Sequence, residues 1–263
     1  MPTKSLSAPS FIRVAEIMGS TIQTALSKKS DEVADMIADG IKRKRKTPIK
    51  EAKAIVAAVY KSEGLVEANR ARLLRIMNRG ADEVADSAIL KRQGKQLGTI
   101  IDKLNDVVKR SADSYLDRIV MTKVAKKIAN GGSPEDVRQV VKKSMDDAEH
   151  YWKNVSNTAS SRIFHYGSMI AAQNAGLKKC TYHAVIDDAT TDFCKAIDGK
   201  TVNLGVAIVK AETLLMQSEE DMMSSEFWDT VNGITRVSGA SLLKNGLTLP
   251  PFHGHCRTTT WFT

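Results

Sequence analysis

The chain has 263 residues, enough for one large or two small domains, and its hydrophobic content of 42% can supply a buried core. Aromatic residues make up only 5%, which suits helix packing better than a β-sandwich or barrel. No apolar run reaches the roughly 18 residues that span a bilayer, and the start of the chain lacks the apolar region of a secretory signal. An odd count of three cysteines argues against a disulfide scaffold. We therefore expect no membrane partner and synthesis in a reducing cytoplasm.

The net charge of +9 is unevenly distributed along the chain. Residues 1–150 carry 29 Lys and Arg against 20 Asp and Glu, whereas residues 151–263 carry 10 of each kind. A basic half joined to a neutral half indicates that the first half meets a polyanion. A solvated helical surface is the alternative interpretation.

The densest cation run in the first half is Lys42, Arg43, Lys44, Arg45 and Lys46. Consecutive cations bind phosphates of any sequence, because each contact releases counterions. No aromatic residue interrupts the run and no zinc-finger spacing is present, so neither base stacking nor sequence-specific readout is indicated. The expected partner is either double-stranded DNA, bound non-specifically, or an acidic surface of another protein.

The spacing of apolar residues predicts helices through most of residues 1–130. Apolar side chains recur at three and four positions over residues 52–60 and 97–124, as on one face of a helix. The first of these helices should end near Gly64, a C-cap candidate. Gly80 and Gly94 mark further expected breaks or kinks. We predict a basic N-terminal region, 1–130, in which long helices form an arm.

The clearest helix boundary in the sequence is the segment 130–136. Ser133 can cap a helix, Pro134 suits its first turn, and Asp136 complements the helix dipole. No helix breaker follows until Gly167, so the helix could continue to Gly176. We therefore predict that region 131–176 is one long connecting helix of about 40 residues, roughly 60 Å in length.

After Gly176 the sequence pattern changes to that of a small mixed module. Strand-forming residues alternate over 180–186, and the segments 200–204 and 258–262 are further strand candidates. The stretch 206–225 permits a helix, and Gly233, Gly239 and Gly246 make the following section loop-like. The predicted fold class is mainly α, with a small C-terminal α+β module over 177–263.

Two motifs in this module form a paired pattern. Residues 187–200 read D-x-x-T-x-x-x-C-x-x-x-D-G-K, and residues 250–257 read P-P-x-H-x-x-C-R. Together they resemble the C-terminal domain of the Mu F-like head morphogenesis proteins, the minor head proteins of tailed phages. The resemblance covers residues 162–263. The positions that carry it or support the module are Arg162, Asp187, Thr190, Asp198, Gly199, Pro251 and Arg257.

The resemblance implies a structural minor head protein that acts in capsid assembly. It implies a place in the virion, in the capsid interior or at the portal vertex, with the portal protein and other head proteins as partners. Among the motif residues, Arg162 is expected to pair with the Asp187–Asp188 cluster, with a surface arginine as the alternative. Asp198 and Gly199 should form a turn, and Pro251 should stiffen the approach to His253. The two motifs should lie side by side.

Cys194, His253 and Cys256 are candidate zinc ligands, because thiolate and imidazole groups are the ligands that zinc prefers. A fourth ligand stays open among Cys180, His183, His255, Asp187 and Asp192. Many proteins of the resembling family carry two further cysteines, and here those positions are Thr191 and Thr258. The alternatives to zinc are two neighbouring buried thiols with a hydrogen-bonded His253, or a Cys194–Cys256 disulfide.

A catalytic interpretation uses the same residues. His253, Cys256 and an aspartate could form a zinc-dependent nuclease or another hydrolase. Against it, the sequence contains no G-x-S-x-G, no HExxH and no phosphate-binding glycine-rich loop. We therefore expect a protein that is not an enzyme and requires no cofactor, with zinc as the one metal that the motifs would suit.

Overall fold

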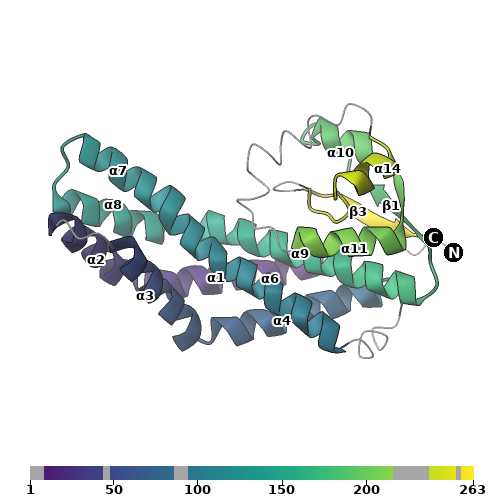
Figure 1. Ribbon diagram of the computed structural model, residues 1–263, viewed down its shortest axis with the longest axis horizontal. Coiled ribbons are helices and arrows are strands. Elements are labelled where there is room, and N and C mark those ends of the chain that lie inside the picture. Colours follow the sequence, from purple (N-terminus) through teal and green to yellow (C-terminus); the bar gives the residue numbers. More distant parts are fainter. Residues whose placement is uncertain (1–8, 44–47, 86–93, 216–236, 253–255) are drawn as a thin grey trace.

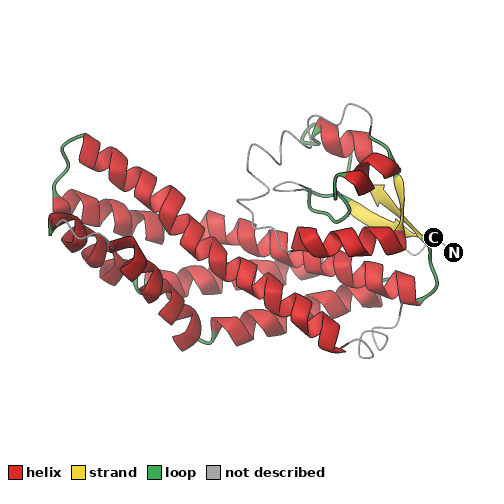
Figure 2. Cartoon of the chain, viewed as in Figure 1, coloured by secondary structure: helices red, strands yellow, loops and turns green. Residues whose placement is uncertain are grey.

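A computed structural model describes residues 9–43, 48–85, 94–215, 237–252 and 256–263 of the chain. These residues form an elongated molecule, in which a long arm of packed helices carries a small module beside one of its ends (Figure 1). Within the described residues, strands occur only in that module (Figure 2). The fold class predicted from the sequence, mainly α with a small C-terminal α+β module, is confirmed.

The arm consists of helices from residue 9 to residue 174. α9 packs against α1 and α4, while α8 packs against α2, so residues after 130 are built into the arm together with those before it. No described helix is long and apolar enough to cross a membrane. In chain order, the described helices are α1 (Pro9–Ser27), α2 (Ser30–Lys42), α3 (Pro48–Ser62), α4 (Leu65–Asp82), α6 (Gly94–Ser114), the π-helix η1 (Tyr115–Val120), α7 (Met121–Ala129), α8 (Pro134–Asp146) and α9 (Glu149–Asn174).

Several interruptions of these helices meet inside the arm. The end of α1, the π-helical turn after α6 and the passage from α8 to α9 surround one small apolar cavity. The rings of Tyr115, Tyr151 and Trp152 pack there, with centroids 4.7 to 6.1 Å apart. Trp152 is only 1% exposed, so it forms the centre of the packing at this level of the arm.

The predicted continuous helix over 134–176 is wrong at one point. The start is as expected, since Ser133 and Asp136 form a reciprocal capping box before Pro134. The chain then turns at residues 147–148 and begins α9. Gln23 donates from its side-chain amide to the carbonyl oxygens of Met145 (3.0 Å) and Asp146 (2.8 Å). Because a side chain from α1 satisfies these carbonyls, the helix can stop without a glycine or proline.

Of the break or kink expected at Gly80, the break is wrong, because α4 continues to Asp82. A β-carbon at Gly80 would lie 2.1 Å from the carbonyl oxygen of Phe164 in α9. Gly167 of α9 meets Met77 of α4 in the same way, at 2.2 Å. These glycines therefore allow two helix backbones to approach closely. The expected boundary at Gly64 is confirmed, because this glycine has a φ of 60° after α3. The break expected at Gly94 stays a prediction, because residues 86–93 lie outside the described residues.

The C-terminal module contains a three-stranded antiparallel sheet in the order β2-β1-β3. The central strand places Cys180 opposite both Val202 and Phe262. Cys180 and Tyr182 of that strand are fully buried, which is the alternation expected of a sheet with one covered face. The described elements of the module are β1 (Lys179–His183), α10 (Asp192–Ile197), β2 (Thr201–Asn203), α11 (Leu204–Leu215), α14 (Gly239–Lys244) and β3 (Thr259–Phe262).

One segment of the module differs from its predicted structure. The section around Gly239, expected to be loop-like, contains α14, because Ser238 and Ser241 form a reciprocal capping box at its start. A β-carbon at Gly239 would lie 2.0 Å from the carbonyl oxygen of Thr201, so this glycine serves close packing on β2. The predicted helical stretch is confirmed up to Leu215. Residues 216–225 and Gly233 lie outside the described residues.

The module is attached to α9 by packing and by polar contacts. α11 packs along α9, and the Tyr166 hydroxyl donates to the Glu212 carboxylate at 3.1 Å. His165 Nδ1 lies 3.2 Å from the Thr260 hydroxyl of β3. His165 and Tyr166 are both buried. The last third of α9 is therefore the surface against which the module packs.

Candidate functional site: the paired C-terminal motifs

The first motif folds into a tight loop around Thr190. The Thr190 hydroxyl donates to the carbonyl oxygen of Val185 (2.6 Å) and accepts from the backbone N–H of Asp187 (2.8 Å). The Asp187 carboxylate accepts from the backbone N–H of Ala189 at 3.0 Å. Aspartate and threonine favour such turns because their short side chains replace backbone partners. The D-x-x-T spacing therefore stabilises the loop, because both side chains hydrogen-bond to its backbone.

The second motif binds this loop through Arg257. Its guanidinium lies 2.6 Å from the Asp187 carboxylate. The hydrogen bond from Arg257 is the largest cause that lowers the pKa of Asp187 below its ordinary value. Both side chains are partly exposed. The pair therefore fixes the relative position of the two motifs more than it adds to the stability of the fold.

Cys194 and Cys256 bring the cores of the two motifs into contact. Their sulfur atoms lie 3.7 Å apart, and the Thr258 hydroxyl is 3.4 Å from the Cys194 sulfur. Cys194 is buried on α10, whereas Cys256 is partly exposed. The hydrogen bond with Cys194 lowers the pKa of Cys256 to about 6 against the effect of burial. The expectation that the two motifs lie side by side is confirmed.

An aromatic contact that the sequence analysis did not single out closes the same junction. Phe252 is 1% exposed and packs edge-on against Tyr182 (5.7 Å between centroids) and Phe193 (5.6 Å). Tyr182 also donates its hydroxyl to the carbonyl oxygen of Thr248 at 2.9 Å. The signal available in the sequence was an aromatic residue in each motif, beside Cys194 and after Pro251.

This architecture agrees with a comparison to protein families. Residues 118–261 match the family model described as Phage Mu protein F like protein. The chain belongs to the phage Mu protein F-like family. The match begins within η1 and includes α7, α8 and α9, so it extends well beyond the 162–263 segment on which the resemblance was based. No curated protein and no solved structure matches the chain.

Family membership makes this chain a phage head morphogenesis protein of the minor capsid kind, which works with other head proteins. In this Mu F-like protein, both threonines at the positions of the relatives' extra cysteines lie at the motif junction. Thr191 caps α10 by accepting from the backbone N–H of Cys194 at 3.3 Å, and Thr258 contacts the Cys194 sulfur. The four positions therefore gather around one point, where two of them carry thiols.

The zinc hypothesis stays a prediction for this Mu F-like protein. His253 and His255 lie outside the described residues. In the described part of the chain, no three His, Cys, Asp or Glu side chains gather closely enough to hold a metal. The nuclease alternative depends on the same histidine and also stays a prediction. Of the possible fourth ligands, Cys180 is buried on β1, and His183 stacks on Trp261 with 4.0 Å between ring centroids.

Two motif residues have roles that differ from expectation. Arg162 is 1% exposed within α9, so it is not a surface arginine. Its predicted pairing with the Asp187–Asp188 cluster is wrong, because Asp187 is bound by Arg257 at the surface. Gly199 has the expected positive φ of 71°, but the Asp198 carboxylate accepts from the backbone N–H of Ala184 (3.0 Å) rather than from its own turn. Pro250 and Pro251 are both buried and are joined by a cis peptide bond.

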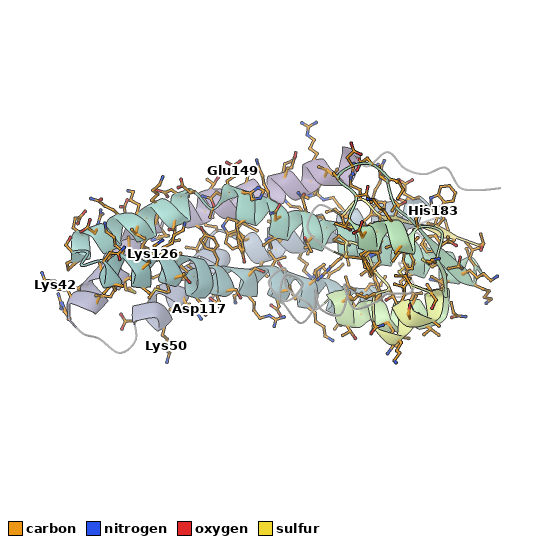
Figure 3. All side chains as sticks on the ribbon, turned by 90° about the horizontal axis from the view of Figure 1, so that it is seen from above. Lys42, Lys50, Asp117, Lys126, Glu149 and His183 are labelled. Atoms are coloured by element: carbon orange, nitrogen blue, oxygen red, sulfur yellow. The ribbon has the colours of Figure 1, made fainter. Side chains whose placement is uncertain are left out.

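The described part of the basic run, Lys42 and Arg43, lies at the end of the arm farthest from the module. Lys42 ends α2, and it lies at the opposite end of the molecule from His183 (Figure 3). Lys42 and Arg43 are exposed, and Arg43 pairs with Asp39 of the preceding turn at 2.8 Å. Lys44, Arg45 and Lys46 lie outside the described residues.

Proposed function

We propose that this head morphogenesis protein acts in capsid assembly at the portal vertex, inside the virion, and that the basic end of its arm contacts packaged DNA without sequence preference. Family membership supports the role in the head. The observation that carries the DNA contact is the concentration of cations at the end of the arm that lies away from the module.

The cations at that end come from three helices. Lys42 of α2, Lys50 of α3, and Lys123 and Lys126 of α7 are all exposed, and none has an ion-pair partner among the described residues. Lys42, Lys50 and Lys126 lie toward the same end of the molecule in Figure 3. Such a cluster attracts a phosphate backbone at any sequence.

Two acidic side chains of α2 are already paired with cations of α8. Asp31 of α2 binds Lys142 (2.7 Å) and Arg138 (3.0 Å), and Arg138 also binds Asp35. The hydrogen bond from Lys142 is the largest cause that lowers the pKa of Asp31. These two carboxylates are therefore engaged by Arg138 and Lys142 and do not pair with the four exposed lysines.

A salt series of DNA retardation tests the DNA contact. Changing Lys42, Arg43, Lys44, Arg45 and Lys46 to Gln should weaken binding and flatten the plot of log affinity against log salt, by about 0.9 for each phosphate that the variant no longer binds. The matched control changes five exposed lysines of the module to Gln: Lys178, Lys179, Lys195, Lys210 and Lys244. The control should bind as the parent protein does. An unchanged slope in the 42–46 variant would rule out this DNA contact.

Electron microscopy of heads that carry a labelled protein tests the position in the capsid. A label at a single vertex is expected, and a label spread over all vertices would contradict the portal assignment.

The alternative partner of the basic run, an acidic surface of another head protein, predicts a different result for the 42–46 variant. That variant would no longer be incorporated into heads, while its DNA affinity would be unchanged.

A further inference from the structure

The contact between Cys194 and Cys256 has the geometry of a reduced disulfide pair. All three cysteines of the chain are thiols in this structure. The 3.7 Å between the Cys194 and Cys256 sulfur atoms exceeds a disulfide bond of about 2.05 Å by less than 2 Å. Rotation of two side chains and a small shift of the backbone at Cys256, which is partly exposed, would close that gap. Cys180, on β1, is the third thiol and is fully buried.

The surroundings of the pair favour a link between two sulfur atoms. The Thr258 hydroxyl contacts the Cys194 sulfur, and threonine occupies both positions where relatives carry further thiols. Cys256 is partly exposed, so a small oxidant can reach it, and Cys194 lies directly behind it.

We propose that Cys194 and Cys256 form a reversible disulfide when the protein leaves a reducing compartment. The oxidant is a small-molecule disulfide, such as oxidised glutathione. The Cys256 thiolate attacks one sulfur of this molecule, forms a mixed disulfide and displaces one glutathione thiolate. The Cys194 thiolate then attacks the Cys256 sulfur and displaces the second. Two thiols of the protein lose two electrons and two protons, and two molecules of reduced glutathione are formed.

The disulfide would link the two motifs covalently, between two cysteines that are 62 residues apart in the sequence. The closed loop contains β2, α11 and α14, which form most of the module. A cross-link of this span restricts the unfolded chain strongly. The module would thus fold and assemble with reduced thiols and become more resistant to unfolding once outside the cell. This inference depends on neither the portal assignment nor the DNA contact, so the experiments above and below can fail separately.

Equilibration of the purified full-length protein in glutathione buffers tests the proposal. Peptide mapping without reductant should find Cys194 linked to Cys256 and Cys180 unlinked. Oxidation should raise the unfolding temperature of the module on the order of 5–10 °C. Cys256→Ser should abolish that rise, while Cys180→Ala, the matched control, should retain it. Cys256 is the better position to change, since its partial exposure makes misfolding of the variant less of a concern than at buried Cys194.

Two results would overturn the proposal. One is a folded parent protein in which both thiols stay alkylatable after equilibration with oxidised glutathione. The other is a protein purified with one zinc ion per chain whose Cys194 and Cys256 resist both alkylation and oxidation until the metal is removed. Neither result depends on a variant, because both are measured on the parent chain.

Discussion

The arm and the C-terminal module are stabilised by different means. The arm buries apolar side chains such as Met18, Leu73 and Ile163 between long helices, and its ion pairs lie at the surface. The module is small, and specific contacts join its two motifs: Asp187 with Arg257, Cys194 with Cys256, and Phe193 with Phe252. The difference indicates how substitutions should change stability. In the arm, the loss should depend on the buried side-chain volume that is removed, whereas in the module it should depend on which single contact is broken.

The largest effect should come from the centre of the arm. Trp152→Ala removes a ring that is 1% exposed and packs on Tyr115 and Tyr151. We expect a loss of about 3–5 kcal/mol in the free energy of unfolding, measured by urea denaturation followed by circular dichroism. Ile17→Ala, at a position that is 47% exposed, is the control and should change it by about 0.5 kcal/mol or less. Equal losses in both variants would contradict the volume argument.

An intermediate effect should come from the junction between arm and module. Burial lowers the pKa of His165 to about 4, so the folded protein keeps this imidazole neutral. The unfolded chain takes up a proton near pH 6.5, so between pH 6.5 and 4 only the unfolded state is protonated at this position. Stability is therefore complete above pH 6.5 and falls as the pH drops toward 4, by up to roughly 3 kcal/mol.

Urea unfolding of the parent protein and of His165→Gln at pH 7 and pH 4.5 measures this dependence. The variant should be less stable at pH 7 and should lose less stability on acidification. His150→Gln, at an exposed position of the same helix, should retain the parent's pH dependence. If His165→Gln and the parent show the same difference between the two pH values, His165 is not the source of it.

The smallest effect on stability should come from the surface pair that aligns the motifs. Asp187→Asn and Arg257→Gln each remove one partner of the 2.6 Å contact, and the double variant removes both. Since both side chains are partly exposed, we expect small losses that are not additive, because either change breaks the same contact. Thermal unfolding of the four proteins measures the coupling. Strictly additive losses would show that the pair does not act as a unit.

Local features of the fold could be predicted from the amino-acid sequence by itself. The cap at Ser133, the turn at Gly199 and the three strand segments depend on neighbouring residues, and the structure contains all of them. The paired motifs were also recognisable, and family membership confirmed the class of protein that they indicated. Their proximity could be expected because each motif carries polar residues that need a partner.

Other features depend on residues that are distant in sequence. The turn between α8 and α9 exists because Gln23, more than 120 residues earlier, takes the freed carbonyls. Gly80 lies within a helix, where its lack of a side chain lets α9 approach the backbone closely. Arg162 is buried and Asp187 pairs with Arg257, although charge alone would also allow Arg162 and Asp187 to pair with each other.

The physical reason for this division is the range of the interactions involved. Capping, turn formation and strand propensity involve atoms within a few residues of one another, so a short window of sequence contains both partners. The end of a helix inside a bundle, or the choice between two possible ion pairs, depends on which surfaces packing brings together. Packing decides those outcomes only once the whole chain has folded.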